Sequence, residues 1–176
     1  ESYSWIYTTY VQILYRYGLR FTSDPEIIKD CIQEVFTSLY KNRNSLITPD
    51  NIKVYLFVSV KNCLIRTLYK ESFYDRELPE NIQFSLESTV EEDFINNEQY
   101  ANQQKMINEI LALLTPRQKE IIYYRFIQEL SMDEICILMN LNYQSAQNLI
   151  QRSLKKVRQN YDSIEVFLLI LAISLK

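Results

Sequence analysis

The sequence predicts an all-α protein in which two small helical domains are joined by a linker. The chain of 176 residues contains one glycine and four prolines, so few of its residues break helices. Its apolar residues recur every three or four positions in several separate segments, the spacing of amphipathic helices. Between two groups of such segments, residues 75–100 lose this periodicity and become rich in acids and amides.

These observations divide the chain into four expected parts. The first helical domain is expected at 1–74, an acidic flexible linker at 75–100, the second domain at 101–160 and a hydrophobic extension at 161–176. The linker is marked by charge as well as by pattern, because residues 71–98 contain nine acids and one arginine.

Composition argues against several kinds of chemistry. The chain has no histidine, its three cysteines form no C-x-x-C pair, and it has no glycine-rich phosphate loop. We therefore expect no enzyme, no metal and no cofactor, and a reducing cytoplasm as the protein's location. The net charge of −3 argues against a wholly basic surface. Tyr143–Asn160 nevertheless holds four cations and no acid, which favours a local surface for nucleic acid.

Two amphipathic helices are expected at the start of the first domain. Residues 3–21 carry aromatic and aliphatic side chains at helical spacing, typical of a helix that faces a core. Asp24 then supplies an N-cap and Pro25 a first-turn proline for a helix over Pro25–Lys41. The polar face of this second helix shows Glu26, Lys29, Asp30, Gln33 and Glu34.

A third helix is expected to start at Thr48 and Pro49 and to run to about Tyr74. Its buried stripe is predicted to contain Val54, Phe57, Val58, Leu64, Ile65 and Leu68. Lys53, Lys61, Asn62, Arg66 and Lys70 lie largely away from that stripe, near Tyr55 and Tyr69. Such a face suits phosphate contacts and base stacking along a nucleic-acid strand, and it equally suits an ordinary solvated helix flank.

The second domain begins with two expected helices. The first carries Met106, Ile110 and Leu114 at helical spacing. The next starts at Pro116, with Thr115 as its N-cap and Gln118 completing a capping box. Ile121, Ile122 and Phe126 are its expected core residues.

A helix-turn-helix pattern follows at residues 131–159. Ser131 and Glu134 form a capping box, and a tight turn is expected at residues 139–142. Ile135, Leu138 and Met139 form the apolar stripe of the first helix. In the second helix of the pattern, Ala146, Ile150, Leu154 and Val157 form an apolar stripe, and Gln144, Asn148, Gln151, Arg152 and Lys155 lie opposite. Two helices of this kind suit insertion into the major groove. A helical hairpin with a basic solvated face is the alternative.

The end of the chain is apolar on nearly all sides. Residues 163–175 are too few to cross a bilayer, which needs about 20 residues. A segment that is hydrophobic all round requires burial, so we expect an extra helix packed within the molecule. Attachment to a membrane surface or to a partner is the alternative.

Three segments together resemble a known family. LTPRQKEIIYYRFIQELSMDEICILMNLNYQSAQNLIQRSLKKVRQ resembles the promoter-binding region 4 of bacterial sigma factors. DPEIIKDCIQEVFTSLYKNR resembles the part of their region 2 that binds core RNA polymerase, and NIKVYLFVSVKNCLIRTLYK resembles the part that melts and recognises the minus-ten element. The direct connection between the two regions resembles extracytoplasmic-function (ECF) sigma factors. The resemblance covers about residues 5–160.

The resemblance, together with the polar faces above, implies roles for individual residues. The residues expected to bind core polymerase are Asp30, Gln33, Glu34 and Phe36. Those expected to bind the minus-ten element are Tyr55, Lys61, Asn62 and Arg66. Those expected to bind the minus-thirty-five element are Gln144, Gln147, Asn148, Gln151, Arg152, Lys155 and Lys156, with Arg158 as a further phosphate contact.

The implied function is promoter recognition and initiation by core RNA polymerase, without covalent chemistry by this chain. The implied partners are core polymerase, promoter DNA and an anti-sigma protein. A helix-turn-helix regulator that acts without polymerase is the alternative. One departure concerns the turn, where Asn140 stands at a position that is glycine in many relatives; asparagine tolerates positive φ, so we expect the turn to persist.

Overall fold

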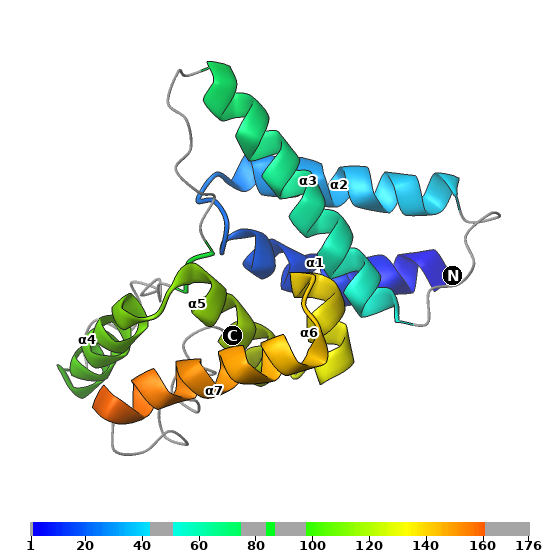
Figure 1. Cartoon of the computed structure of the whole chain (residues 1–176). Helices are drawn as coiled ribbons and strands as arrows, with labels where there is room; N and C mark the ends of the chain where they lie inside the picture. Colours follow the sequence, from blue (N-terminus) through cyan, green and yellow to red (C-terminus); the bar gives the residue numbers. More distant parts are fainter. Residues whose placement is uncertain (1, 43–50, 75–83, 87–97, 161–176) are drawn as a thin grey trace. The chain divides into compact units, whose positions relative to one another are not determined.

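The computed structural model describes residues 2–42, 51–74, 84–86 and 98–160 (Figure 1). Every regular element within these ranges is a helix, which confirms the predicted fold class. The chain divides into two compact units, Glu1–Gln83 and Phe84–Lys176, which we describe separately. None of the helices in the described ranges combines the length and the apolar character that crossing a membrane requires.

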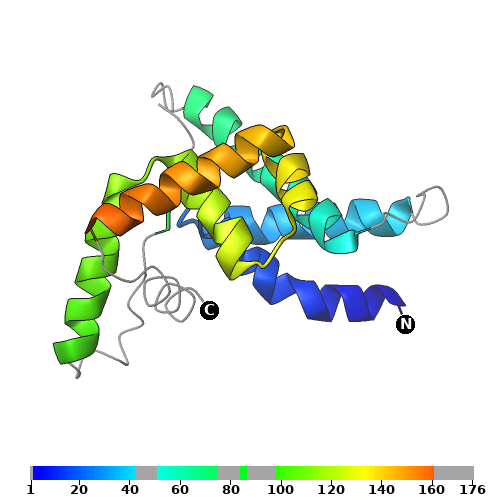
Figure 2. The same cartoon turned by 60° about the horizontal axis from the view of Figure 1, so that its bottom comes forward.

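Unit 1 is built from three helices that all pack on one another. They are α1 (Ser2–Gly18), α2 (Pro25–Lys41) and α3 (Ile52–Tyr74). In Figures 1 and 2, α1 and α2 run beside each other and α3 crosses them both. Their shared core contains Leu14 and Tyr17 of α1, Ile28 of α2, and Leu56 and Phe57 of α3, all of which are fully buried.

The start of α2 confirms the cap predicted from the sequence. Asp24 has extended backbone geometry, and its Oδ1 accepts hydrogen bonds from the amides of Glu26 (2.8 Å) and Ile27 (3.4 Å). Pro25 follows as the first helical residue, where no hydrogen-bond donor is needed. The helix ends at Lys41, as expected.

The buried stripe of α3 is broader than the sequence predicts. The side chains that are buried are Val54, Leu56, Phe57, Val60, Cys63 and Leu64, whereas the expected core residues Val58, Ile65 and Leu68 are half-buried. Because α3 packs on both α1 and α2, its buried arc is wider than the single stripe of an ordinary amphipathic helix. The expected start at residues 48–49 lies outside the described residues; Asn51 Oδ1 accepts from the Val54 amide (3.2 Å).

Unit 2 contains four α-helices and one π-helical turn within its described residues. They are α4 (Glu98–Leu113), α5 (Pro116–Ile122), the π-turn η2 (Tyr123–Ile127), α6 (Met132–Met139) and α7 (Tyr143–Asn160). The Thr115–Gln118 capping box at the start of α5 is present, as predicted. The π-turn buries Tyr123 and Tyr124 side by side and leaves Phe126, which the sequence places in the core, half-buried.

A short piece of the expected linker packs against this π-turn. Phe84 and Leu86 are buried, and the Phe84 ring lies 5.4 Å from that of Tyr123 and 6.2 Å from that of Tyr124. Residues 75–83 and 87–97 lie outside the described residues, so the linker boundaries remain a prediction. The expected hydrophobic helix at 161–176 lies outside them too.

Close packing between α1 and α2 depends on Gly18. A Cβ atom added at this position would lie 2.5 Å from Cγ2 and 3.0 Å from Cγ1 of Ile28, a fully buried residue. Atoms that close overlap, so any larger residue must push the two helices apart or force Ile28 out of its preferred rotamer.

We therefore expect Gly18→Ala to lower the free energy of unfolding by about 1–3 kcal/mol. Urea unfolding of the full chain measures this change. The control is a double-mutant cycle with Ile28→Ala, which removes the two atoms that the new methyl group would meet. The methyl group should cost much less in the Ile28→Ala background, and an equal cost in both backgrounds would contradict the overlap.

Candidate nucleic-acid interface

The turn between α6 and α7 is fixed by backbone and capping bonds. At the start of α6, the Glu134 amide donates to Ser131 Oγ (3.3 Å), and the Ser131 amide donates to Glu134 Oε2 (2.6 Å). At its end, Asn140 adopts a left-handed conformation with φ of 49°, and the Leu141 amide donates to the Cys136 carbonyl (3.0 Å). The capping box and the tolerance of Asn140 for positive φ are both confirmed.

The beginning of α7 and its buried face set which side chains point outward. Asn142 Oδ1 accepts from the Ser145 amide (2.8 Å) and caps the helix. Ala146 and Val157 are fully buried, as predicted, whereas Ile150 and Leu154 of the same predicted stripe are half-buried. Ser153 is buried as well; its hydroxyl donates to the Leu149 carbonyl (2.7 Å), so this polar side chain is satisfied within the helix. The stripe prediction missed Ser153 because it counted only apolar residues.

The opposite face of α7 carries amides and cations. Gln144, Gln147, Gln151, Arg152 and Lys155 are exposed, and Asn148 is half-buried. The side chain of Gln144 donates to Asn148 Oδ1 (3.1 Å), which orients two amides on adjacent turns. In the major groove, a glutamine or asparagine can bind adenine through two hydrogen bonds, and an arginine can bind guanine in the same way. The face thus has the chemistry for reading base edges.

Lys156 has a different environment from the other predicted contacts of α7. It is half-buried, and its Nζ donates to the carbonyl of Leu113 (3.2 Å), the last residue of α4. A cation at a helix C-terminus satisfies a carbonyl that lacks a helical partner and interacts favourably with the helix dipole. This contact ties α7 to α4, so Lys156 has a structural role in addition to any contact with DNA.

Two further features near the turn were missed by sequence reasoning. Arg117 Nη2 donates to the Met139 carbonyl (3.3 Å) at the end of α6, and thereby links α5 to the turn. Ile137 and Tyr143 are 64% and 55% exposed, although both are large and hydrophobic. Ile137 is not part of the predicted apolar stripe of α6, and this periodicity was the available signal for its exposure.

In unit 1, the predicted minus-ten residues share one face of α3, with one exception. Asn62 and Arg66 are exposed, and Tyr55 is half-buried seven positions before Asn62, on the same side of the helix. Tyr69, also exposed, continues this face. Lys61 is half-buried and, one position before Asn62, points about 100° away around the helix.

The predicted polymerase-binding residues also separate into two groups. Asp30, Gln33 and Glu34 are exposed and line a hollow of about 500 Å³ along α2, together with Thr37, Ser38, Lys41 and Asn42. Phe36 is only 2% exposed; its ring meets those of Tyr3 and Tyr7 edge-on, at 6.0 and 5.0 Å. Phe36 thus supports the packing of α1 on α2 and does not share the surface of the other three.

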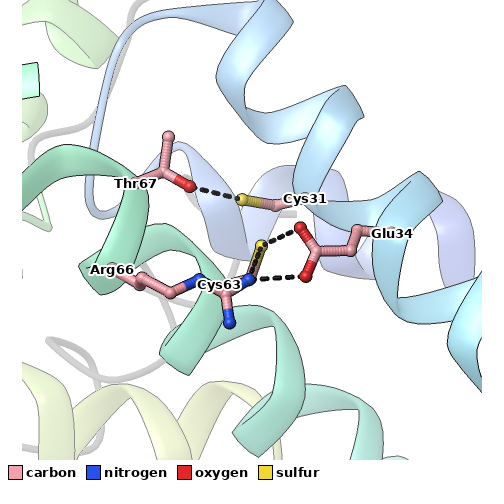
Figure 3. A network of polar contacts seen from close by, with 5 residues as sticks. All are labelled: Cys31, Glu34, Cys63, Arg66 and Thr67. Atoms are coloured by element: carbon pink, nitrogen blue, oxygen red, sulfur yellow. Dashed lines mark hydrogen bonds and ion pairs between the residues drawn. The ribbon is translucent and has the colours of Figure 1, made fainter. Parts of the chain in front are cut away.

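A polar network joins α2 to α3 and extends from the exposed Glu34 and Arg66 to the buried Cys31 and Cys63. Figure 3 shows Arg66 Nη2 donating to Glu34 Oε1 (2.5 Å) and to the sulfur of Cys63 (3.5 Å), while the Cys63 thiol donates to Glu34 Oε2 (3.5 Å). Cys31 and Thr67 lie 3.7 Å apart, Sγ to Oγ1, in the same cluster. The structure thus pairs a residue predicted to bind DNA with one predicted to bind polymerase.

The charges in this network follow from its geometry. The Arg66 guanidinium beside Glu34 holds the pKa of that carboxyl below its usual range, so Glu34 is charged at neutral pH. Burial raises the pKa of the Cys63 thiol to about 12, so this sulfur remains protonated and acts as a hydrogen-bond donor. A protonated, buried thiol is a poor nucleophile, which favours a structural role for Cys63.

Comparison with known proteins agrees with the two units. The Sigma-70 region 2 family profile matches residues 6–73, and the Sigma-70, region 4 profile matches residues 104–157. The ECF RNA polymerase sigma factor SigX of Bacillus subtilis (strain 168) is 22% identical over 165 residues, which is 92% of this chain and 84% of SigX.

A solved structure has a similar fold. It is the co-crystal structure of the sigma factor RpoE in complex with the anti-sigma factor NepR from Bartonella quintana, which matches with a TM-score of 0.63 and 12% sequence identity. The match covers 90% of this chain and 96% of the other. With both sigma regions present in order and an ECF relative matching along nearly the whole length, the chain belongs to the sigma-70 family as an ECF-type sigma factor.

Proposed function

We propose that this chain binds core RNA polymerase, recognises the minus-ten and minus-thirty-five elements of a promoter, and promotes the initiation of transcription. The observation that carries this proposal is that profiles of both sigma regions match this chain in order, at residues 6–73 and 104–157. Members of this family act by binding, so the chain contributes recognition and strand separation, and the polymerase contributes the chemistry.

Duplex reading is assigned to α7. Its exposed amides and Arg152 offer hydrogen-bond donors and acceptors to base edges, whereas Lys155 and Arg158 are suited to phosphates. The absence of any acid between Tyr143 and Asn160 means that no carboxylate on this helix repels the DNA backbone.

Capture of the opened strand is assigned to α3. A base that leaves the stack loses stacking and pairing energy, which a pocket with amide hydrogen bonds and aromatic surface can offset. Asn62 supplies the amide, and Tyr55 and Tyr69 supply aromatic surface on the same face. Arg66 is the cation of this face, available for a phosphate when it is not paired.

Polymerase docking is assigned to the exposed side of α2. Asp30 and Glu34 make this surface acidic, and Gln33 lies between them. We also propose an anti-sigma protein as a regulatory partner, because the structurally similar sigma factor is complexed with one. With these partners, the proposed location of the protein is the cytoplasm.

The experiment that tests the proposed function is reconstitution of the full chain with core polymerase. The chain should copurify with core enzyme and direct initiation at one class of promoters. Asn62→Ala should retain core binding but reduce strand opening, measured with a fluorescent base analogue in the minus-ten element. Gln12→Ala, an exposed amide on α1, is the control and should behave as wild type. Failure of the wild-type chain to bind core polymerase would refute the proposal.

A contact between Arg152 and a base should affect binding at one position of the promoter only. Arg152→Ala should remove about 1–3 kcal/mol of discrimination at one position of the minus-thirty-five element. Selection of active promoters from a library randomised in that element measures this loss. Arg158→Ala is the control, because a lost phosphate contact should weaken binding to all sequences equally. Equal loss across sequences in the Arg152 variant would contradict base reading.

The two neighbouring lysines of α7 should separate stability from DNA binding. Lys156→Met removes the hydrogen bond to Leu113 and should lower the free energy of unfolding by about 0.5–1 kcal/mol. Lys155→Met, on the exposed face, should leave unfolding unchanged and weaken DNA binding by the holoenzyme. Thermal unfolding and promoter binding, measured on both variants, make the comparison. The opposite assignment of the two effects would show that Lys155, not Lys156, holds the helices together.

A further inference from the structure

The Glu34–Arg66 ion pair connects two surfaces that have different partners. Glu34 belongs to the exposed side of α2, beside Asp30 and Gln33, whereas Arg66 belongs to the exposed face of α3, one turn from Asn62. The two charges meet directly, with Nη2 of Arg66 2.5 Å from Oε1 of Glu34 (Figure 3). A partner that engages one residue of the pair therefore competes with the other residue for its charge.

The pair is well formed but accessible. Both carboxylate oxygens of Glu34 are occupied, one by Arg66 and the other by the Cys63 thiol. The side chains of Arg66 and Glu34 nevertheless remain 53% and 61% exposed. Exposed ion pairs are weak, because water screens them and both long side chains lose freedom. An incoming charged group can therefore exchange with either member without disrupting the core of unit 1.

We propose that Glu34 restrains Arg66 in the free protein, and that engagement of Glu34 by a cationic side chain of the polymerase releases Arg66 to contact a phosphate of the opened strand. This inference rests on the proposed function, since it assumes that α2 meets polymerase and α3 meets DNA. It makes Glu34 a positioning residue for a DNA contact on another helix. Strand binding and polymerase binding are thereby coupled through one side chain.

The choice of a cationic partner follows from charge complementarity. Glu34 carries a negative charge at neutral pH whether or not Arg66 is paired with it, and Asp30 adds a second acid one turn earlier on α2. A lysine or arginine approaching this surface can replace Arg66 at the carboxylate with no net loss of ion pairs. Once released, Arg66 gains a phosphate partner, so the exchange conserves favourable contacts on both sides.

The test measures how tightly the full chain, without polymerase, binds a fluorescein-labelled single-stranded oligonucleotide of mixed sequence. Glu34→Gln should raise the affinity by about two- to five-fold at low salt, the range expected when an exposed ion pair no longer competes. One additional phosphate contact should also steepen the dependence of log affinity on log salt concentration by about 0.7. Fluorescence anisotropy gives both quantities.

Two controls separate release of Arg66 from a general change in charge. Glu26→Gln removes another carboxylate of α2, one that pairs with Lys29 at 2.7 Å and is similarly exposed, so it makes the same charge change away from α3. Its effect should be much smaller than that of Glu34→Gln. Glu34→Asp keeps the charge but withdraws the carboxylate by one methylene, and it should raise the affinity as well.

The double variant decides whether Arg66 is the group released. Glu34→Gln combined with Arg66→Gln should bind the oligonucleotide no more tightly than Arg66→Gln alone. An increase that persists without Arg66, or an equal increase in Glu26→Gln and Glu34→Gln, would overturn the inference. So would unchanged affinity in both Glu34→Gln and Glu34→Asp.

Failure of the inference can be told apart from failure of the proposed function. In the complex with core polymerase, Arg66→Gln should weaken strand binding if α3 meets the opened strand. If Arg66→Gln does not weaken strand binding in the complex, the role proposed for Arg66 itself is wrong. A clear effect of Arg66→Gln in the complex, with no effect of Glu34 substitutions in the free chain, would leave the proposed function intact and refute only the coupling.

Discussion

The packing of α3 against α2 is the constraint on which the functional surfaces of unit 1 depend. Val60 and Leu64 of α3 are fully buried, and Cys63 is small enough to lie between the helices beneath Glu34. This contact fixes which residues of each helix remain outside. An acidic surface on α2 and an amide- and arginine-bearing face on α3 thus become neighbours, joined at the Glu34–Arg66 pair. Separate partners can bind the two surfaces, but the shared core holds the surfaces in a fixed position relative to each other.

In unit 2, local bonds at helix ends add to the packing of α7 on α5 and α6 in setting the orientation of α7. The start of α6, the left-handed Asn140 and the Asn142 cap are each satisfied by residues within a few positions. Two cations bind carbonyl groups at helix C-termini. Arg117 binds the end of α6, and Lys156 binds the end of α4. Rigid placement of α7 matters because a hydrogen bond to a base edge tolerates little error in position. Capping bonds that contribute little energy can therefore still help to read a DNA sequence, because they fix the position of α7.

The difference between local and tertiary causes explains what the sequence could predict. Caps, first-turn prolines and the positive φ of Asn140 depend on a few neighbouring residues, so the sequence alone predicts them. The orientation of α3 was predicted only in part, because a helix packed on two partners buries a wide arc that one apolar stripe does not describe. Similarly, the burial of Phe36 depends on Tyr3 and Tyr7 of α1, which no pattern within α2 reveals.

The charge inventory of the chain also bears on how it works with a polymerase. Of the four cations on α7, Lys156 donates to the Leu113 carbonyl and Arg152 is proposed to read a base, which leaves Lys155 and Arg158 for phosphates. Arg66, the single arginine on the face of α3 that is proposed to contact the opened strand, is paired with Glu34. Because phosphate contacts supply most of the sequence-independent affinity for DNA, we expect a chain of net charge −3 with few available cations on α7 to bind duplex weakly by itself. The recognition face is rich in amides, which discriminate among bases but attract no phosphate from a distance.

Affinity must then come from the polymerase, and the sigma factor contributes selectivity. A low intrinsic affinity is consistent with this division, since it keeps the free chain from occupying promoters without the enzyme.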